Sequence, residues 1–192
     1  MTSTVSETCH YPYQTLWPAT AQRPLLGFAA WSGTGKTTLL KAVIPLLRQS
    51  GLRLALIKHA HHDFDVDVPG KDSHTLRKAG ADQVLITSGR RWALMQERPE
   101  IRDPRLEEEI ARLDQSGIDL ILVEGFRHER FPKIELIRKP AGDRPPLFLQ
   151  DDSIVAIATP DQLELECSLP RLPLDHPETV TRFILDQIVT PR

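Results

Sequence analysis

Two spacings of apolar residues run along this chain and predict alternating strands and helices. Short apolar runs indicate strands, the alternation at residues 133–138 indicates a strand with one solvent-exposed face, and apolar residues three and four positions apart indicate helices with one buried face. The expected strands span residues 25–29, 52–57, 83–87, 92–96, 118–124, 133–138 and 154–158. The expected helices begin near residues 38, 74, 104 and 178. This order predicts an α/β fold of the P-loop NTPase type, with a mainly parallel sheet flanked by helices.

Breaker residues refine these boundaries. Pro45 lies inside the first expected helix, where its missing N–H should kink the helix or end its first half. Ser50-Gly51 stops that helix, and Gly51 suits a left-handed cap. Ser88-Gly89 supplies a turn between the strands at 83–87 and 92–96, which predicts a β-hairpin extension.

Residues 1–23 lack any clear apolar period and are rich in Thr, Ser, Pro and Gln. We therefore expect an irregular N-terminal arm at 1–23, followed by a single domain at 24–192.

Composition excludes several classes of protein. The chain has 192 residues, of which 40% are hydrophobic and 26% charged, as in ordinary globular domains. Its net charge of −2 argues against a nucleic-acid partner, which normally requires a basic face. No apolar run approaches the ~18 residues of a membrane span. Cys9 and Cys167 lack metal-ligand spacing and are interpreted as reduced thiols of a cytoplasmic protein.

The strongest chemical signal is Ala30-Trp31-Ser32-Gly33-Thr34-Gly35-Lys36-Thr37, between an expected strand and an expected helix. Backbone N–H groups of such a loop cradle nucleotide phosphates, and the following helix directs its positive end at them. Lys36 would lie along the β- and γ-phosphates, and the Thr37 hydroxyl would coordinate Mg²⁺. Ala30 replaces the usual first glycine, so the backbone there should not need a positive φ. The predicted nucleotide contacts are Ser32, Gly33, Thr34, Gly35, Lys36, Thr37 and Thr38.

A second signal closes the expected strand at 118–124. Four aliphatic residues precede Glu124 and Gly125, which describes a buried parallel strand that carries a carboxylate to its carboxyl end. Glu124 would bind Mg²⁺ or orient the attacking water, and is with Lys36 the predicted catalytic pair. Gly125 would let its N–H approach a γ-phosphate closely. Asp119 opens the same strand and should play a structural role at the opposite end of the sheet.

Residues 58–73 leave the carboxyl end of a strand and carry an unusual concentration of His and Asp. Zinc binding, a solvated charged loop, and a loop that closes over a triphosphate are the alternatives. The third is favoured because Mg²⁺ prefers oxygen ligands. The spacing does not rank Asp63, Asp65 and Asp67; Asp63 is taken as the candidate metal ligand beside Thr37 and Glu124.

Base recognition is predicted at the end of the strand at 154–158. Asp161 could accept hydrogen bonds from guanine N1–H and N2–H, which adenine lacks. A simple Thr/Asp turn is the alternative.

Four stretches together resemble the molybdopterin-guanine dinucleotide biosynthesis protein B family, the molybdenum cofactor guanylyltransferase adaptors. They are residues 28–40, 57–63, 69–73 (Pro-Gly-Lys-Asp-Ser) and 120–126. The resemblance covers about residues 24–160. It implies a cytoplasmic P-loop protein that binds Mg²⁺ and GTP, forms a homodimer and hydrolyses GTP weakly. It further implies a guanylyltransferase partner, with molybdopterin as a second candidate ligand.

By position, the resemblance assigns phosphate and Mg²⁺ binding to Gly33, Gly35, Lys36 and Thr37, and completes the triphosphate site with Glu124 and Gly125. The His-Asp loop would respond to the nucleotide or face the partner. We expect slow hydrolysis, because no water-positioning Gln or finger Arg is evident in the sequence.

Two other functions stay open at this point. A small-molecule kinase using ATP would need an acceptor pocket and a lid with arginines, for which Arg90-Arg91 is the only candidate. A pure interaction module would carry a loop that no longer binds nucleotide.

Overall fold

The computed structural model describes residues 10–60, 64–139 and 145–190. The chain forms two compact units, one made of Met1–His59 with Pro104–Arg192 and the other of Ala60–Asp103. The second unit is thus an insertion into the sequence of the first.

A six-stranded sheet forms the centre of the first unit, and all its strand pairs are parallel. Its order is β2-β5-β1-β6-β7-β8. The strands are β1 (Leu25–Ala29), β2 (Leu54–Lys58), β5 (Leu120–Glu124), β6 (Lys133–Leu136), β7 (Ile154–Thr159) and β8 (Arg171–Pro173). The predicted α/β fold with a mainly parallel sheet is confirmed. Strand β8 was not predicted, because a proline-rich three-residue segment carries no strand period.

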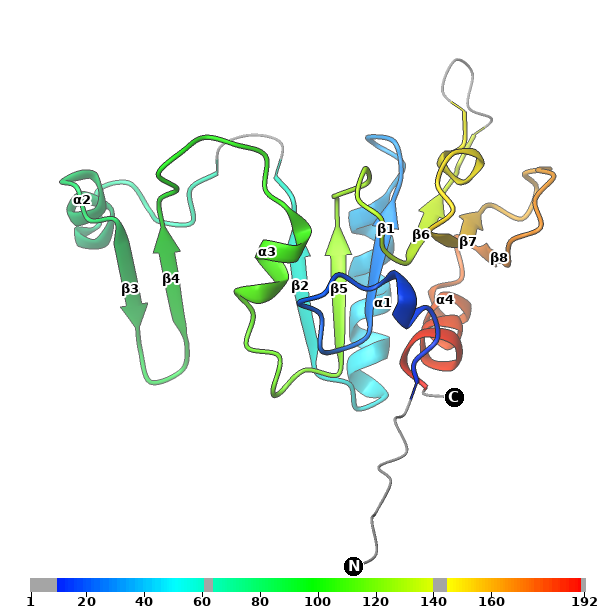
Figure 1. Cartoon of the computed structure of the whole chain (residues 1–192), viewed down its shortest axis with the longest axis horizontal. Helices are drawn as coiled ribbons and strands as arrows, with labels where there is room; N and C mark the ends of the chain where they lie inside the picture. The colour runs from blue at the N-terminus through cyan, green and yellow to red at the C-terminus, as the bar shows by residue number, and fades with distance from the viewer. Residues whose placement is uncertain (1–9, 61–63, 140–144, 191–192) are drawn as a thin grey trace, which may run out of the picture. The chain divides into compact units, whose positions relative to one another are not determined.

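Helices cover the two faces of this sheet in separate layers (Figure 1). One face packs on α1 (Lys36–Gln49) and on α4 (Pro177–Ile184), which continues as a π-helical segment, Leu185–Val189. The other face packs on α3 (Leu106–Ala111). Two short 3₁₀ helices lie at Gln14–Leu16 and Leu147–Leu149. The central strands are buried on both faces, as parallel sheets require.

Helix α1 runs through Pro45 to Gln49 as one element, so of the two alternatives predicted at Pro45, a kink or an end of the helix, the end is wrong. Pro45 and Lys41, whose carbonyl loses its helical partner, both lie on the exposed side of the helix. Water can satisfy that carbonyl, while the buried stripe Leu40, Val43 and Leu47 holds the helix on the sheet. Gly51 adopts the predicted left-handed cap, at φ 91°.

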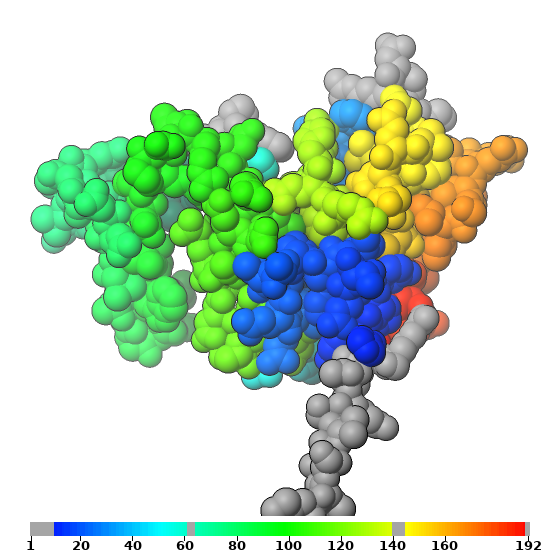
Figure 2. Space-filling model, viewed as in Figure 1, coloured from blue at the N-terminus to red at the C-terminus, as the bar shows by residue number. Residues whose placement is uncertain are grey.

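Residues 10–23 belong to the first unit and pack against the rest of it. Tyr13 and Leu16 contact one core cluster, and Trp17 contacts the other. Gln115 binds the segment twice, accepting from Gln22 N (2.8 Å) and donating to Thr20 O (3.0 Å). Figure 2 shows this segment in blue, lying against the green surface around α3.

The second unit contains α2 (Asp72–Lys78) and the antiparallel pair β3 (Gln83–Thr87) and β4 (Trp92–Gln96), which confirms the predicted hairpin. Within this unit Arg77 forms two ion pairs, with Asp65 (2.5 Å) and with Glu97 (2.6 Å), and so links the segment before α2 to the end of the hairpin. Most side chains of the hairpin are exposed. No helix among the described residues is long and apolar enough to cross a membrane.

Candidate functional site

The phosphate loop joins β1 to α1 at the carboxyl end of the sheet. Gly33 and Gly35 have φ of 79° and 104°, which only glycine adopts without strain, and Gly35 is the residue that precedes the helix. Ala30 has no positive φ, as its side chain required. The Thr34 hydroxyl donates to the Trp31 carbonyl (2.7 Å) and fixes the turn within the loop. The predicted loop conformation therefore follows from the two glycines.

Lys36 begins α1 and its amine folds back over the loop, where Nζ donates to the Ala30 carbonyl at 3.2 Å. Burial lowers the pKa of Lys36, Glu124 opposes this shift, and the charges of Arg127 and Lys58 lower the pKa further. Lys36 is thus held across the mouth of the loop with its charge only partly compensated by protein groups.

Thr37 and Glu124 lie side by side, as the sequence predicted. The Thr37 hydroxyl donates to Glu124 Oε1 at 3.1 Å, and Lys58 Nζ lies 3.3 Å from Glu124 Oε2. In the sheet, Glu124 of β5 is aligned with Lys58 of β2 on one side and with Phe28 of β1 on the other. This register places Lys58, Glu124 and the loop that follows β1 at the same end of the sheet. A hydroxyl and a carboxylate oxygen that face each other are a donor set suited to Mg²⁺.

Gly125 follows Glu124 at φ 103° and packs tightly against His59. A Cβ on Gly125 would lie 2.6 Å from the Cβ of His59, so no larger residue fits. His59 N donates to the Glu124 carbonyl (2.8 Å), and its ring lies 4.8 Å from that of Phe126. These contacts fix the backbone that carries Glu124.

An open pocket of about 300 Å³ adjoins the loop, lined by residues 31–34 and 135–139 and by Pro146. Arg138 crosses from the end of β6 to the loop, where Nε donates to the Thr34 carbonyl (2.7 Å) and Nη1 lies 3.7 Å from Asp175 Oδ1. Buried Glu135 accepts hydrogen bonds from Leu147 N and Phe148 N. Burial raises the pKa of Glu135, and these two bonds oppose the rise.

The remaining predicted residues have other surroundings or lie outside the described residues. Asp161 is exposed, two positions beyond β7, at the same end of the sheet as the loop. Asp63 lies outside the described residues. Asp65 pairs with Arg77, and Asp67 accepts from Ser73 Oγ (2.9 Å), both within the second unit. Among the described residues, no group of three or more His, Cys, Asp or Glu side chains is placed to hold a metal.

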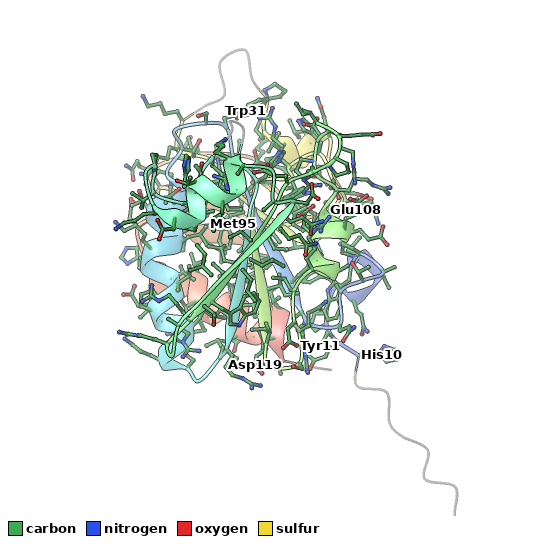
Figure 3. All side chains as sticks on the ribbon, turned by 90° about the vertical axis from the view of Figure 1, so that its left-hand side faces the viewer. His10, Tyr11, Trp31, Met95, Glu108 and Asp119 are labelled. Atoms are coloured by element: carbon green, nitrogen blue, oxygen red, sulfur yellow. The ribbon has the colours of Figure 1, made fainter. Side chains whose placement is uncertain are left out.

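Asp119 lies at the opposite end of the sheet, as predicted. Its carboxylate accepts from Arg53 N (2.8 Å) and Nε (3.1 Å), and these bonds from Arg53 lower the pKa of Asp119. Figure 3 shows Asp119 and Trp31 of the phosphate loop at opposite ends of the molecule.

Sequence reasoning assigned no role to three cations of the site: Lys58, Arg127 and Arg138. Each lies just before or after the carboxyl end of a parallel strand, which is the only signal that could have pointed to them.

Comparison with known proteins identifies the family of this chain. The family model described as "Molybdopterin guanine dinucleotide synthesis protein B" matches residues 25–160, which include the loop, Glu124 and the end of β7. The chain belongs to this family. A protein B relative, the molybdopterin-guanine dinucleotide biosynthesis adapter protein of Escherichia coli K12, is 51% identical over 85% of this chain and 92% of its own. The adapter protein of the same name from Haemophilus influenzae is 42% identical over 77% and 81%.

Solved structures of protein B family members share the fold. The crystal structure of Bacillus subtilis MobB has a TM-score of 0.68 and 24% identity, covering 86% of this chain and 98% of its own. The MobB homologue from Bacillus stearothermophilus has a TM-score of 0.63 and 22% identity, covering 84% and 95%. These likenesses show that this chain and the solved family members share one fold.

Proposed function

We propose that this chain is a Mg·GTP-binding accessory protein of molybdopterin guanine dinucleotide biosynthesis, which assists a guanylyltransferase and hydrolyses GTP weakly. The observation that carries the proposal is the meeting of Lys36, Thr37 and Glu124 at the mouth of a glycine-bearing loop. The pathway comes from membership of the protein B family. The cytoplasmic location stays a sequence-based expectation.

The site residues divide the work on the triphosphate. Backbone N–H groups of Gly33, Thr34 and Gly35 and the positive end of α1 would bind phosphate oxygens. Lys36 would exchange its bond to the Ala30 carbonyl for stronger charge-assisted bonds to phosphate. Thr37 and Glu124 would hold Mg²⁺, which supplies charge neutralisation for the phosphates. The tightly packed Gly125 would present its N–H at the γ-phosphate position.

Calorimetry with Mg·GTP and Mg·ATP tests this function. Wild-type protein should bind Mg·GTP in preference, and Lys36→Ala should weaken binding about 100-fold or more through the loss of charge-assisted bonds. Lys41→Ala is the matched control, because Lys41 is exposed on the same helix and should leave binding unchanged. Preference for ATP with γ-phosphoryl transfer to a small molecule would favour the kinase alternative. Failure to bind either nucleotide would leave only an interaction module.

Guanine selection is assigned to Asp161. Asp161→Asn should weaken GTP binding far more than ATP binding, because it removes the acceptor for two guanine donors. Asp175→Asn is a demanding control, since Asp175 lies at the same end of the sheet but faces Arg138. Loss of guanine preference in Asp175→Asn alone would remove the role proposed for Asp161.

The proposal includes a homodimer. In the hairpin, Leu85 opposes Leu94 and Thr87 opposes Trp92, so these residues share one face. Leu85, Leu94 and Trp92 are 59%, 51% and 69% exposed within a single chain. Contiguous apolar surface of this kind marks an interaction site, and a two-stranded hairpin is marginal without further packing. A second copy of the chain would cover this face.

A further inference from the structure

Arg127 is a cation of the site that neither the predicted chemistry nor the roles above employ. Its guanidinium carbon lies 4.7 Å from the centroid of the Trp31 ring, and Trp31 is the second residue of the phosphate loop. Its Nε donates to the neighbouring His128 ring at 3.0 Å. Among the residues that the structure describes, no carboxylate pairs with Arg127. The charge is therefore held above the loop by an aromatic face, a contact weak enough to exchange.

The backbone brings Arg127 back toward the loop by a strained turn. Gly125 and Phe126 have successive positive φ values, 103° and 52°. Such a conformation is rare for a bulky residue like Phe126. It is held by burial of the Phe126 side chain, which is 6% exposed, and by its contact with the His59 ring. Strain of this kind concentrates at functional sites, and here it directs the residue after Phe126 over the phosphate loop.

The charges around the loop are unbalanced. Lys36, Lys58 and Arg127 are cations, and both Lys58 and Arg127 act on Lys36, whose pKa is lowered mainly by burial. Glu124 is the carboxylate that opposes them. Arg138 is a fourth cation at the loop, and Asp175, 3.7 Å from it, is a second carboxylate. Four cations against two carboxylates leave an excess of positive charge, which suits a polyanionic ligand. Lys36 lies across the loop and Lys58 is paired with Glu124, so Arg127 has the most readily exchanged contact of the three.

We propose that Arg127 leaves the Trp31 ring to bind the terminal phosphate of the nucleotide, and so makes the site distinguish GTP from GDP. The proposal rests on the proposed function. Arg127 follows Gly125, the residue assigned to the γ-phosphate, by two positions on one short turn. A guanidinium binds phosphate oxygens through two parallel charge-assisted bonds, whereas its contact with Trp31 is a single aromatic one. The γ-phosphate is the group that GDP lacks, so Arg127 contributes affinity to GTP alone.

Binding measurements with GTP and GDP test the proposal. Arg127→Ala should weaken Mg·GTP binding about tenfold to a hundredfold, the range for one charged hydrogen-bond partner. It should change Mg·GDP binding less than about threefold, and Arg127→Lys should recover part of the GTP affinity. Arg130→Ala is the matched control: Arg130 is exposed, lies three residues on and pairs with Asp152. Equal weakening of GTP and GDP binding, or no weakening, would overturn the proposal.

Tryptophan emission provides a second measurement that does not depend on the alanine variant. Mg·GTP should change the emission of Trp31 as the guanidinium leaves its ring, and Mg·GDP should change it less. Trp31→Phe keeps an aromatic ring at this position and removes the emission of Trp31. The emission that remains comes from Trp17 and Trp92, so the difference between the two proteins is the signal of Trp31. Identical emission changes with both nucleotides would contradict the movement of Arg127. Wild-type protein that binds neither nucleotide would overturn the proposed function as well, whereas an unchanged GTP-to-GDP ratio in Arg127→Ala would overturn this inference alone.

Discussion

Gly33 and Gly125 have the same backbone requirement in different surroundings. Both have positive φ, but a Cβ on Gly33 would meet no heavy atom within 4 Å, whereas one on Gly125 would meet His59 Cβ at 2.6 Å. Gly33 is therefore needed for conformation alone, and Gly125 for conformation and close packing. This difference separates two effects that a glycine-rich motif usually combines.

The Gly→Ala variants of these two positions should differ in stability. Gly33→Ala should lower the free energy of unfolding by about 1 kcal/mol from backbone strain, and Gly125→Ala by about 3 kcal/mol because a steric clash is added. Urea denaturation of the two variants measures the difference. His59→Gly in the Gly125→Ala background removes the clashing Cβ and should restore part of the loss. Equal losses at the two glycines would show that His59 does not restrict Gly125.

The site residues divide into those that local sequence specifies and those that tertiary register specifies. Gly35, Lys36 and Thr37 were predictable because a strand, a tight loop and a helix are consecutive in the chain. Lys58 reaches the same site because its strand, β2, pairs with β5, and Arg138 reaches it through its hydrogen bond to the phosphate loop. A single sequence does not show which parallel strands are adjacent, so the position of these cations near strand ends was the only indication that they share one site.

At the scale of elements, buried Lys133 joins three segments that meet at the start of β6. Its ammonium donates to the Glu129 carbonyl and pairs with Asp151 at 2.9 Å. Burial alone would raise the pKa of Asp151, but hydrogen bonds from Ser153 and Lys133 outweigh it and lower the pKa. The connection between β5 and β6 is thus fixed by a buried cation at the first residue of β6.

Replacing Lys133 should destabilise the protein in a pH-dependent way. Lys133→Met should lower the free energy of unfolding by about 2–3 kcal/mol at pH 7, because it leaves partly buried Asp151 without its cation. A carboxyl whose folded pKa is lowered stabilises above its unfolded pKa of about 3.9, and this stability is lost as pH falls through the folded pKa. The difference between wild type and variant should therefore shrink below about pH 4. Denaturation at several pH values measures it.

Arg130→Met serves as the control for that series. It breaks the neighbouring Arg130–Asp152 pair, whose side chains are 60% and 75% exposed, and should have little measurable effect on stability. A constant difference between wild type and Lys133→Met from pH 7 to pH 3 would argue against a role for the Asp151 charge.

Elements with a strong apolar period were the predictable part of the fold. The core strands β1, β5 and β7 and the hairpin all lie where apolar runs indicated them. Strand β8 and the path of α1 through Pro45 depend on packing against neighbours, which overrides weak local preference. The alternation at residues 133–138 predicted a strand with one solvent-exposed face, and this was wrong: Lys133 and Glu135 are both buried, because Asp151 pairs with one and the backbone N–H groups of residues 147 and 148 satisfy the other.

At the scale of the whole molecule, the exposed hairpin face makes a prediction about assembly. Leu85→Glu should convert the proposed homodimer to monomer, because it puts a charge in the centre of an apolar contact. Gln83→Glu is the matched control on the same face and should keep the dimer. Analytical ultracentrifugation measures both. Monomeric wild-type protein, or a dimer that tolerates Leu85→Glu, would remove this face from the interface.

The strand order has a consequence for synthesis of the chain. β1, which leads into the phosphate loop, pairs with β5 and β6, and both follow it in the chain after α1, β2, all of the second unit and α3. A ribosome adds about 5–20 residues per second, so β1 waits for seconds before a neighbour exists. Meanwhile the hairpin is completed first, because its strands are local. Nascent chains should therefore contain both strands of the hairpin before β1 gains either of its neighbours in the sheet.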